Sequence, residues 1–470
     1  MNKLILCFSI GLVFAVASPL PADVTVTLTV DPSKLGPKIA DDYAGLSYET
    51  KREMADAGGN YYFSPQNAPL IKMFQTLGIK NLRIGGNTVD SPKVSIPANA
   101  DIDQLFQFAQ AADTKVIYSF RLNKGNPEAA AAQAKYIAAK YAANLVCFSI
   151  GNEPDVYVHS YPGYLKAFRP IYDAISQAVP GATFCGPSLT SNHYPWALDF
   201  AKDFYPGGKI LYITQHQYAG GAGGKITDPV HGRDLLLSPG WQDIYQKYSD
   251  KFGAPLKAAG YPFRLEEANN FYNGGAKDVS DTFASALWGL DYLYWWAAHD
   301  SQGVNFHNGD EVAAGQELRP CRYASFTSVP DGYFAHPLAY AIKIFNLGSR
   351  GQIVSSTVTP ETVDLNFAGY AVLGADKAVY VTLINKEHGA NGRDADVAIQ
   401  AGSYSKVQTI ALVAPKNDVA AKDGLTLGGS GIQHDGSWQG TWSDVPSPST
   451  GPVHVKVPAS SILLVKLTGS

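Results

Sequence analysis

The chain contains little charge and little cysteine. Only 17% of its 470 residues are charged, with 37 Lys and Arg against 41 Asp and Glu, and four residues are Cys. A net charge of −4 without a dense Lys/Arg cluster argues against a nucleic-acid or anionic-membrane partner. Four cysteines are too few for a disulfide scaffold, whereas the apolar fraction of 46% excludes intrinsic disorder. We expect a globular protein with a large core.

Long apolar runs are also scarce, and the one clear example stands at the start of the chain. Lys3 provides a short basic start, residues 4–16 are largely apolar, and Ala15-Val16-Ala17 offers an A-x-A cleavage site. This pattern is typical of a secretory signal peptide, and a run of about thirteen residues is too short to span a bilayer. We expect a signal peptide over 1–22, a secreted or periplasmic protein, and no membrane partner.

Eight short strand-like runs alternate with helical patterns from about residue 42 onward. The clearest helical pattern covers 127–143, where Asn126 can cap the helix and Pro127 occupies its first turn. Eight such units are typical of a (β/α)8 barrel. A doubly wound open sheet would also alternate, but no Gly-rich phosphate-binding turn follows the first strand. We therefore predict an α/β protein with a TIM barrel over 41–346. The expected strands cover 43–48, 80–85, 115–120, 145–150, 182–186, 210–216, 262–266 and 303–306.

The helical pattern stops after about residue 346. Short strand-like runs follow, separated by Gly, Asp, Asn and Pro, which is typical of an antiparallel sandwich. Residues 24–30 alternate with period two and precede the barrel. We predict a β-sandwich formed by 347–470 together with an N-terminal strand from 23–40. The expected C-terminal strands cover 357–366, 371–373, 378–384, 397–399, 407–413, 453–457 and 462–467.

Two glutamates stand at the ends of strands that would face each other across the barrel mouth. Glu153 follows the fourth predicted strand and Glu267 closes the seventh, and barrel active sites lie at these strand ends. Carboxylates about 5–5.5 Å apart suit a retaining glycosidase, whereas about 6.5–9.5 Å suits an inverting one. Glu266 competes with Glu267, but alternation along a strand predicts that only one of them faces the mouth. No metal-ligand spacing accompanies these residues, so we expect no metal and no cofactor.

The ordered motifs resemble a known family. Asn152-Glu153-Pro154 and the Glu after the seventh strand resemble the clan A retaining glycosidases. More narrowly, Leu82-Arg83-Ile84-Gly85-Gly86, with Glu267 followed by Tyr272 and Gly274-Gly275, resembles glycoside hydrolase family 79. That family contains bacterial β-glucuronidases and the heparanases. The resemblance extends over essentially the whole chain after the signal, and it implies that Glu153 is the acid/base and Glu267 the nucleophile.

The resemblance also implies residues that support this pair. Asn152 would hydrogen-bond the sugar 2-OH, an interaction that strengthens in the transition state. Arg83 would keep the nucleophile ionised, with a structural ion pair as the alternative. His216 would support the site, and Tyr218 would donate to the nucleophile unless it is simply a buried core residue.

A glucuronidase must bind the carboxylate at C5 of its substrate. The family does so with Tyr hydroxyls and backbone N–H groups of a Gly-rich turn, which here resembles residues 271–275. Asn273 stands where the heparanases have Gly. The second tyrosine position is Phe306, which cannot donate, so His307 or Tyr333 would replace it. The residues that we expect to bind substrate are Glu49, Asn87, Asn152, Tyr218, Tyr272, Asn273, Gly274, His307 and Tyr333.

The resulting hypothesis is a secreted, monomeric, retaining exo-β-glucuronidase that removes terminal β-linked glucuronic acid from glycans. An endo-acting, heparanase-like enzyme is the first alternative, although cleavage within a sulfated chain would need clustered Lys and Arg along the cleft. A catalytically inactive carbohydrate-binding barrel is the alternative from another class, and the presence of both glutamates argues against it.

Overall fold

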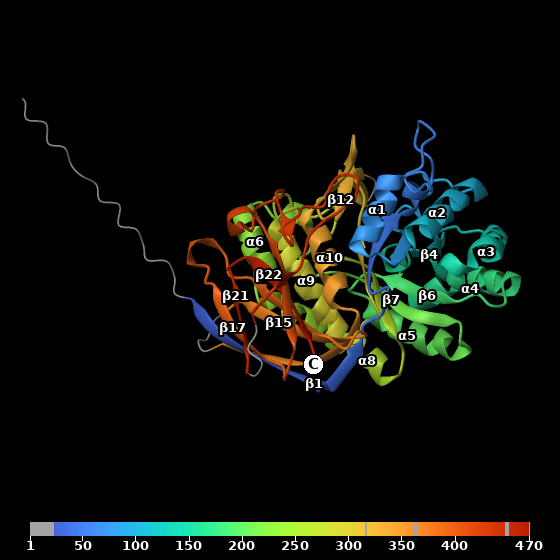
Figure 1. Ribbon diagram of the computed structural model, residues 1–470. Helices are drawn as coiled ribbons and strands as arrows, with labels where there is room; N and C mark the ends of the chain where they lie inside the picture. The colour runs from blue at the N-terminus through green and yellow to red at the C-terminus, as the bar shows by residue number, and fades with distance from the viewer. Residues whose placement is uncertain (1–22, 315–316, 361–364, 447–450, 470) are drawn as a thin grey trace, which may run out of the picture.

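Eight parallel strands close into a barrel in the computed structural model (Figure 1). The structure describes residues 23–314, 317–360, 365–446 and 451–469, so the expected signal over 1–22 lies outside the described residues. The barrel confirms the predicted fold class. Its strands are β2 (Ala44–Glu49), β3 (Asn81–Gly85), β4 (Lys115–Phe120), β5 (Leu145–Ile150), β6 (Phe184–Leu189), β7 (Ile210–Tyr218), β8 (Phe263–Asn269) and β9 (Val304–His307).

The helices between these strands start where the sequence provides caps. Asn126 caps α3 by accepting from the Ala129 N–H at 2.8 Å, with Pro127 in the first turn. The α-helices are α1 (Ala68–Leu77), α2 (Asn99–Ala112), α3 (Pro127–Tyr141), α4 (Tyr161–Ala178), α5 (Tyr194–Phe204), α6 (Pro229–Leu237), α7 (Gly240–Lys251), α8 (Gly253–Ala258), α9 (Phe283–Ala298) and α10 (Pro337–Gly348). Short 3₁₀ helices are η1 (Thr50–Glu53), η2 (Ala142–Asn144), η3 (Pro154–Val156), η4 (Tyr205–Gly207), η5 (Gly223–Lys225), η6 (Gly389–Asn391) and η7 (Pro415–Asn417).

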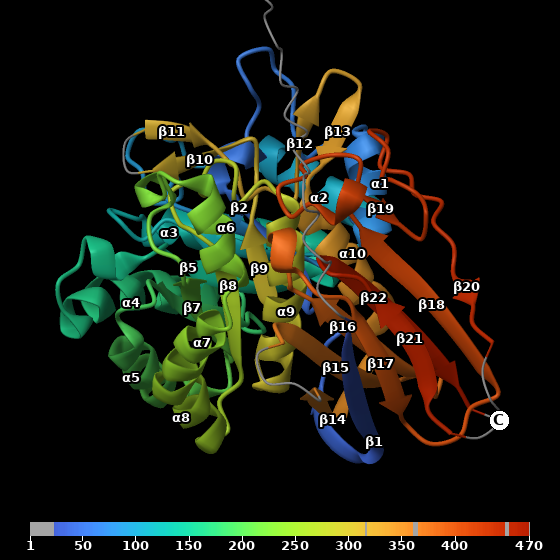
Figure 2. The ribbon, with the colours of Figure 1, turned by 90° about the vertical axis from the view of Figure 1, so that its left-hand side faces the viewer.

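Two hairpins interrupt the barrel between β9 and α10, where the sequence predicts no strand. They are β10 (Glu311–Ala314) with β11 (Glu317–Pro320), and β12 (Phe326–Val329) with β13 (Gly332–Ala335). Because they follow the C-terminal end of β9, they lie at the end of the barrel where the active site is expected (Figure 2).

The remaining strands form one large sheet that includes the N-terminal strand. The strand β1 (Val24–Lys38) pairs antiparallel with β14 (Gly351–Pro360) and parallel with β17 (Ala395–Gln400), as predicted. The strand expected over 357–366 starts earlier, and residues 361–364 lie outside the described part. The other strands are β15 (Phe367–Gly374), β16 (Val379–Asn385), β18 (Lys406–Val413), β19 (Thr426–Leu427), β20 (Ser443–Asp444), β21 (Val453–Val457) and β22 (Ser461–Thr468), in the order β19-β18-β22-β16-β15-β14-β1-β17-β21 with β20 against β18.

The sheet buries both of its faces, as the alternation along β22 shows. Ile462 and Leu464 join the core of the barrel, whereas Val465 and Leu467 belong to a second core enclosed by the sheet itself. Figure 2 shows α9 and α10 between the barrel strands and the sheet, and a buried ion pair of 2.7 Å from Lys386 to Asp291 joins the sheet to α9. The division of the chain at residues 40 and 346 stays a prediction. Among the described residues, no helix combines the length and hydropathy needed to cross a bilayer.

Candidate active site

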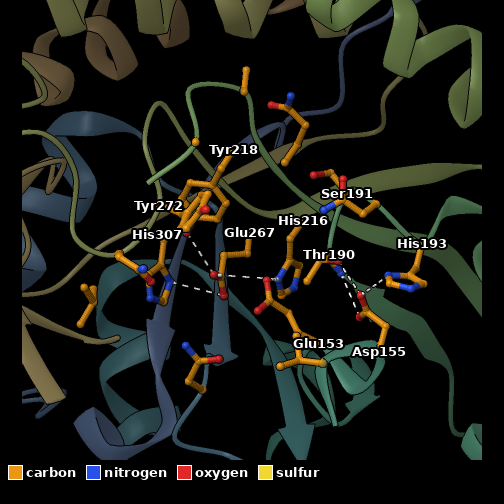
Figure 3. A pocket seen from close by; sticks show the side chains of 18 of the residues that line it. Glu153, Asp155, Thr190, Ser191, His193, His216, Tyr218, Glu267, Tyr272 and His307 are labelled. Atoms are coloured by element: carbon orange, nitrogen blue, oxygen red, sulfur yellow. Dashed lines mark hydrogen bonds and ion pairs between the residues drawn. The ribbon is translucent and has the colours of Figure 1, made fainter. Parts of the chain in front are cut away.

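A cavity of about 750 Å³ opens at the C-terminal ends of the barrel strands. Both predicted catalytic glutamates line it (Figure 3). The other residues predicted for the site that line it are Asn87, His216, Tyr218, Tyr272, Asn273 and His307. The barrel therefore brings together side chains that are up to 220 positions apart, from Asn87 to His307, because parallel strands end at one rim.

Glu153 is held just past the end of β5 in an unusual backbone conformation. Its φ of 44° and ψ of 52° lie in the left-handed region, which non-glycine residues seldom adopt. The Glu153 N–H donates to the Ser188 carbonyl oxygen at 2.8 Å, and the preceding Asn152 N–H donates to Asp90 at 2.8 Å. These bonds fix the turn, and they leave the Glu153 side chain 21% exposed at the cavity. Such strained residues concentrate at functional sites.

Glu267 on β8 is more deeply placed and is surrounded by donors. Its Oε2 accepts from the Arg83 guanidinium at 2.8 Å, and its Oε1 accepts from the Tyr218 hydroxyl at 3.0 Å. Burial raises the pKa of this carboxyl, but the positive charges of His307, His216 and Arg83 and the Tyr218 hydroxyl outweigh burial and lower the pKa to about 2. Glu267 is therefore ionised at neutral pH, as a nucleophile must be.

His216 on β7 lies between the two glutamates. Its Nδ1 is 3.0 Å from Glu153 Oε1 and 3.9 Å from Glu267 Oε1, and its Nε2 is 3.8 Å from Glu266 Oε1. Burial alone would lower the pKa of this imidazole, but the Glu267 charge and the bonds to Glu153 and Glu266 raise the pKa to about 10. His216 is therefore an imidazolium that donates from Nδ1 to Glu153 and interacts through its charge with Glu266 and Glu267.

The same three residues form the group of the described chain that could hold a metal ion. One ligand atom each from Glu153, His216 and Glu267 lies within 4.8 Å of the other two. A metal ion binds the neutral form of histidine. Here the neighbouring carboxylates stabilise the protonated, positively charged form of His216 instead. The positive charge of His216 therefore compensates the two glutamates, which is the role that a bound cation would otherwise have.

Glu266 and Glu267 both lie within 3.9 Å of His216, but of the two only Glu267 faces the cavity, as alternation along the strand predicts. The pairing of β7 with β8 steps from Gln215 opposite Leu265 directly to His216 opposite Glu267, which leaves Glu266 as an extra residue in a β-bulge. Glu266 is fully buried and lies 3.5 Å from Cys185 Sγ. Glu267 lines the cavity and Glu266 does not, so only Glu267 is accessible to a substrate in the cavity.

Arg83 on β3 connects the nucleophile to Asn152. The fully buried guanidinium donates from Nη1 to Glu267 and Ser47, and from Nη2 to Asn152 Oδ1 at 2.8 Å. Because this bond uses the amide oxygen of Asn152, its Nδ2 is directed to Asn87 Oδ1 at 3.1 Å. Asn152 is thus held next to the guanidinium that binds the nucleophile, but it is buried and does not line the cavity.

The turn after β8 has the backbone that the Gly-rich motif requires. Asn273, Gly274 and Gly275 have φ values of 60°, 90° and 85°. Asn is among the residues that tolerate the left-handed region best, which explains how Asn273 can occupy a position expected to hold Gly. The adjacent Tyr272 is 41% exposed.

One tyrosine of the cavity is not predicted from the sequence. Tyr323 lines it, with its ring 6.1 Å from that of Tyr218 and 6.2 Å from that of His307. Phe306, considered for the second tyrosine position, is instead fully buried against Trp288 and Tyr292. Tyr323 follows the β10–β11 hairpin, and no periodic pattern in the sequence marks that segment.

Glu49 and Tyr333 do not line this cavity. They line a neighbouring one of about 490 Å³. Glu49 Oε2 accepts from the Thr88 N–H and hydroxyl at 2.8 and 2.7 Å, and Oε1 accepts from the Ala313 N–H at 3.2 Å. Glu49 thus stabilises the wall between the two cavities. The Tyr333 hydroxyl oxygen accepts a hydrogen bond from the Asn67 side-chain amide at 2.7 Å.

Comparison with known proteins agrees with the geometry. No protein-family model matches the chain. A β-glucuronidase of Aspergillus niger is 23% identical over 353 residues, and one of Neurospora crassa is 22% identical over 358 residues. The resemblance to β-glucuronidases is confirmed. Each alignment covers 65% of this chain, but only 63% and 62% of the respective relatives' own lengths.

Solved structures share the architecture over almost the whole chain. A 4-O-α-L-rhamnosyl-β-D-glucuronidase from Fusarium oxysporum has a TM-score of 0.70 at 18% identity, covering 94% of this chain and 100% of its own. A family 51 arabinofuranosidase from Xanthomonas axonopodis pv. citri has a TM-score of 0.68 at 15% identity, covering 95% and 100%. At these identities the similarity establishes the fold.

Proposed function

We propose that the protein is a retaining exo-β-glucuronidase that removes a terminal β-linked glucuronic acid residue from its substrate. The observation that supports this most is the pair Glu153 and Glu267, which offer carboxylate oxygens within 4.8 Å of each other beside His216 (Figure 3). This separation is close to the about 5–5.5 Å of retaining enzymes and shorter than the about 6.5–9.5 Å that gives room for the water of an inverting enzyme.

The two glutamates are suited to different roles. Glu267, ionised and held by Arg83 and Tyr218, would attack the anomeric carbon and form a covalent glycosyl-enzyme. Glu153, at the more exposed edge, would first protonate the departing oxygen and then take a proton from the water that hydrolyses the intermediate. His216 would hold both carboxylates in place throughout.

Neutral donors would bind the sugar carboxylate. Among the described residues, no Lys or Arg lines the cavity, whereas Tyr272 and Tyr323 do, beside the left-handed turn at Asn273. Hydrogen bonds from hydroxyl and backbone N–H groups can bind a carboxylate without a salt bridge. The lack of lining Lys and Arg also disfavours a sulfated polymer, and with it the endo-acting, heparanase-like alternative.

One wall of the cavity supports exo action. Asn87, which follows β3, donates to the Ala313 carbonyl oxygen of β10 at 2.9 Å, and Glu49 accepts from the Ala313 N–H. These bonds join the β10–β11 hairpin to the barrel rim and separate the cavity from its neighbour. A pocket closed on that side accommodates a terminal sugar better than the middle of a chain.

The direct test compares 4-nitrophenyl β-glucuronide with the corresponding β-glucoside and β-galactoside. Preference for the glucuronide supports the proposal, preference for the neutral sugars refutes carboxylate recognition, and turnover of none supports the carbohydrate-binding alternative. Trapping with a 2-fluoro glucuronide followed by peptide mapping tests the retaining mechanism, since the label should appear on Glu267. We also propose that the protein acts after export, as the sequence of residues 1–22 indicates.

A further inference from the structure

The cavity continues beyond the two catalytic carboxylates into a lobe on the Glu153 side. We define the leaving-group lobe by five lining residues: Thr190 and His193, their chain neighbour Asn192, Val156 next to Asp155, and Ile244 on α7, a helix that reaches Tyr194 through Lys251. Figure 3 shows Asp155, Thr190, Ser191 and His193 on one side of Glu153, with Tyr272 and His307 on the other. The lobe thus lies opposite the groups that would surround the sugar ring.

The wall of the lobe is fixed to the segment that contains the acid/base. Asp155, two residues after Glu153, pairs with His193 Nδ1 at 2.8 Å and accepts from the Thr190 N–H at 3.1 Å. The Asp155 side chain is only 1% exposed. The His193 ring also packs near Trp196, with ring centroids 5.6 Å apart. These contacts make the lobe a preformed part of the cavity.

Exposed aliphatic side chains from two separate elements line this lobe. Val156 on η3 is 65% exposed and Ile244 on α7 is 40% exposed. Single exposed apolar residues are ordinary on a protein surface. In the described chain, however, three of the eight large hydrophobic side chains that are exposed line this one cavity, namely these two and Tyr272. Apolar groups gathered in a concave site indicate a ligand with an apolar surface.

The charge of the lobe disfavours an anionic occupant. No Lys or Arg of the described residues lines the cavity, and the His193 ring is already paired with the buried Asp155 carboxylate. A sulfate or a second uronic acid entering here would lose its hydration without gaining a Lys or Arg partner in return.

We propose that the leaving-group lobe binds an uncharged aglycone with an apolar body, of the alkyl or aryl class. The inference rests on the proposed function, because the acid/base must lie beside the glycosidic oxygen and the group attached to that oxygen must then extend past Glu153. It adds the chemical class of the leaving group and the residues that select it, Val156 and Ile244.

The test uses methyl, butyl and octyl β-glucuronides. Their alcohols differ little in acidity, so differences in kcat/KM report contacts with the leaving group rather than its chemistry. We expect kcat/KM to rise at least about tenfold from methyl to octyl, since each buried methylene contributes up to about fourfold. Val156→Ser and Ile244→Ser should each reduce the octyl-to-methyl ratio about three- to tenfold. Thermal unfolding midpoints close to the wild-type value show that both variants fold.

Leu35→Ser is the matched control, because Leu35 is 56% exposed on β1 and does not line the cavity. It should leave the ratio unchanged. Equal kcat/KM for the three alkyl glucuronides would overturn the inference while leaving glucuronidase activity intact. A higher kcat/KM for a glucuronyl oligosaccharide than for the octyl compound, unaffected by Val156→Ser, would also overturn it. Failure to hydrolyse any β-glucuronide would refute the proposed function and this inference with it.

Discussion

Replacing Glu153 by Ala should separate the two chemical steps of the proposed reaction. For methyl β-glucuronide, whose leaving group must be protonated as it departs, loss of a general acid lowers kcat/KM by about 10² to 10⁴. This corresponds to about 3 to 5 kcal/mol of transition-state stabilisation. For 2,4-dinitrophenyl β-glucuronide, which departs as a stable anion, kcat/KM should fall by less than about tenfold. With that substrate the glycosyl-enzyme should accumulate, because its hydrolysis loses the general base.

The surroundings of Glu153 predict that a small anion can replace it. The imidazolium of His216 lies 3.0 Å from the oxygen that the substitution removes, and burial at the cavity edge keeps that charge poorly screened. A unit anion about 4 Å from this charge gains about 1 to 4 kcal/mol, depending on the effective dielectric constant. Azide should therefore enter the vacated space, attack the glycosyl-enzyme and restore turnover of the dinitrophenyl substrate by about tenfold or more.

The assay follows release of the chromophore and identifies the product by NMR. Two displacements at the same carbon should give the β-glucuronyl azide. Glu153→Gln is the control, because it removes the proton while filling the space, so azide should not restore its activity. Equal losses of kcat/KM for the methyl and dinitrophenyl substrates, or an α-configured azide product, would refute the assignment of Glu153.

Four further substitutions test other parts of the structure. Glu267→Gln should lower kcat by about 10⁴ or more, whereas Glu266→Gln, outside the cavity, should cost far less; a fully active Glu267→Gln would show that the nucleophile is misassigned. Tyr323→Phe should lower kcat/KM for the glucuronide about 10- to 100-fold, the cost of one hydrogen bond to a charged group, and a similar loss with the β-glucoside would contradict carboxylate binding. Glu53 is fully buried, and burial raises its pKa from 4.5 to about 8 despite a hydrogen bond from Tyr118 at 3.1 Å. Its contribution to stability is therefore complete below pH 4.5 and is lost as the pH rises towards 8, by about 5 kcal/mol in total; Glu53→Gln should show a Tm advantage that grows from pH 5 to pH 8, and a constant difference would argue against it.

The barrel and its two glutamates could be predicted because local patterns determine them. Strands such as β4 and β5 are short apolar runs with the same bounds in prediction and structure. Barrel closure then places every strand end on one rim, so Glu153 and Glu267 could be paired without knowledge of any contact. Their positions at the ends of predicted strands were sufficient to place these two glutamates at the same rim of the barrel.

Other parts of the site depend on features that leave no local pattern. Tyr323 reaches the cavity through the excursion between β9 and α10, and Tyr333 in the same excursion lies at the neighbouring cavity instead. The bulge on β8 brings Glu266 to His216, and only the register against β7 reveals it. Glu49 ends its strand as expected, but tertiary hydrogen bonds direct its carboxylate to Thr88 and Ala313.

The pairing of β1 has a consequence for the order in which the chain can fold. Val26 lies opposite Pro360 on one side and Val397 on the other, so the first strand has no partner until the last third of the chain has emerged. Until then its alternating apolar residues are an unpaired strand, which is the kind of segment that promotes association between chains. Assembly of the sheet must therefore follow synthesis of nearly the whole polypeptide, and the barrel can form before the segment that precedes it in sequence is in place.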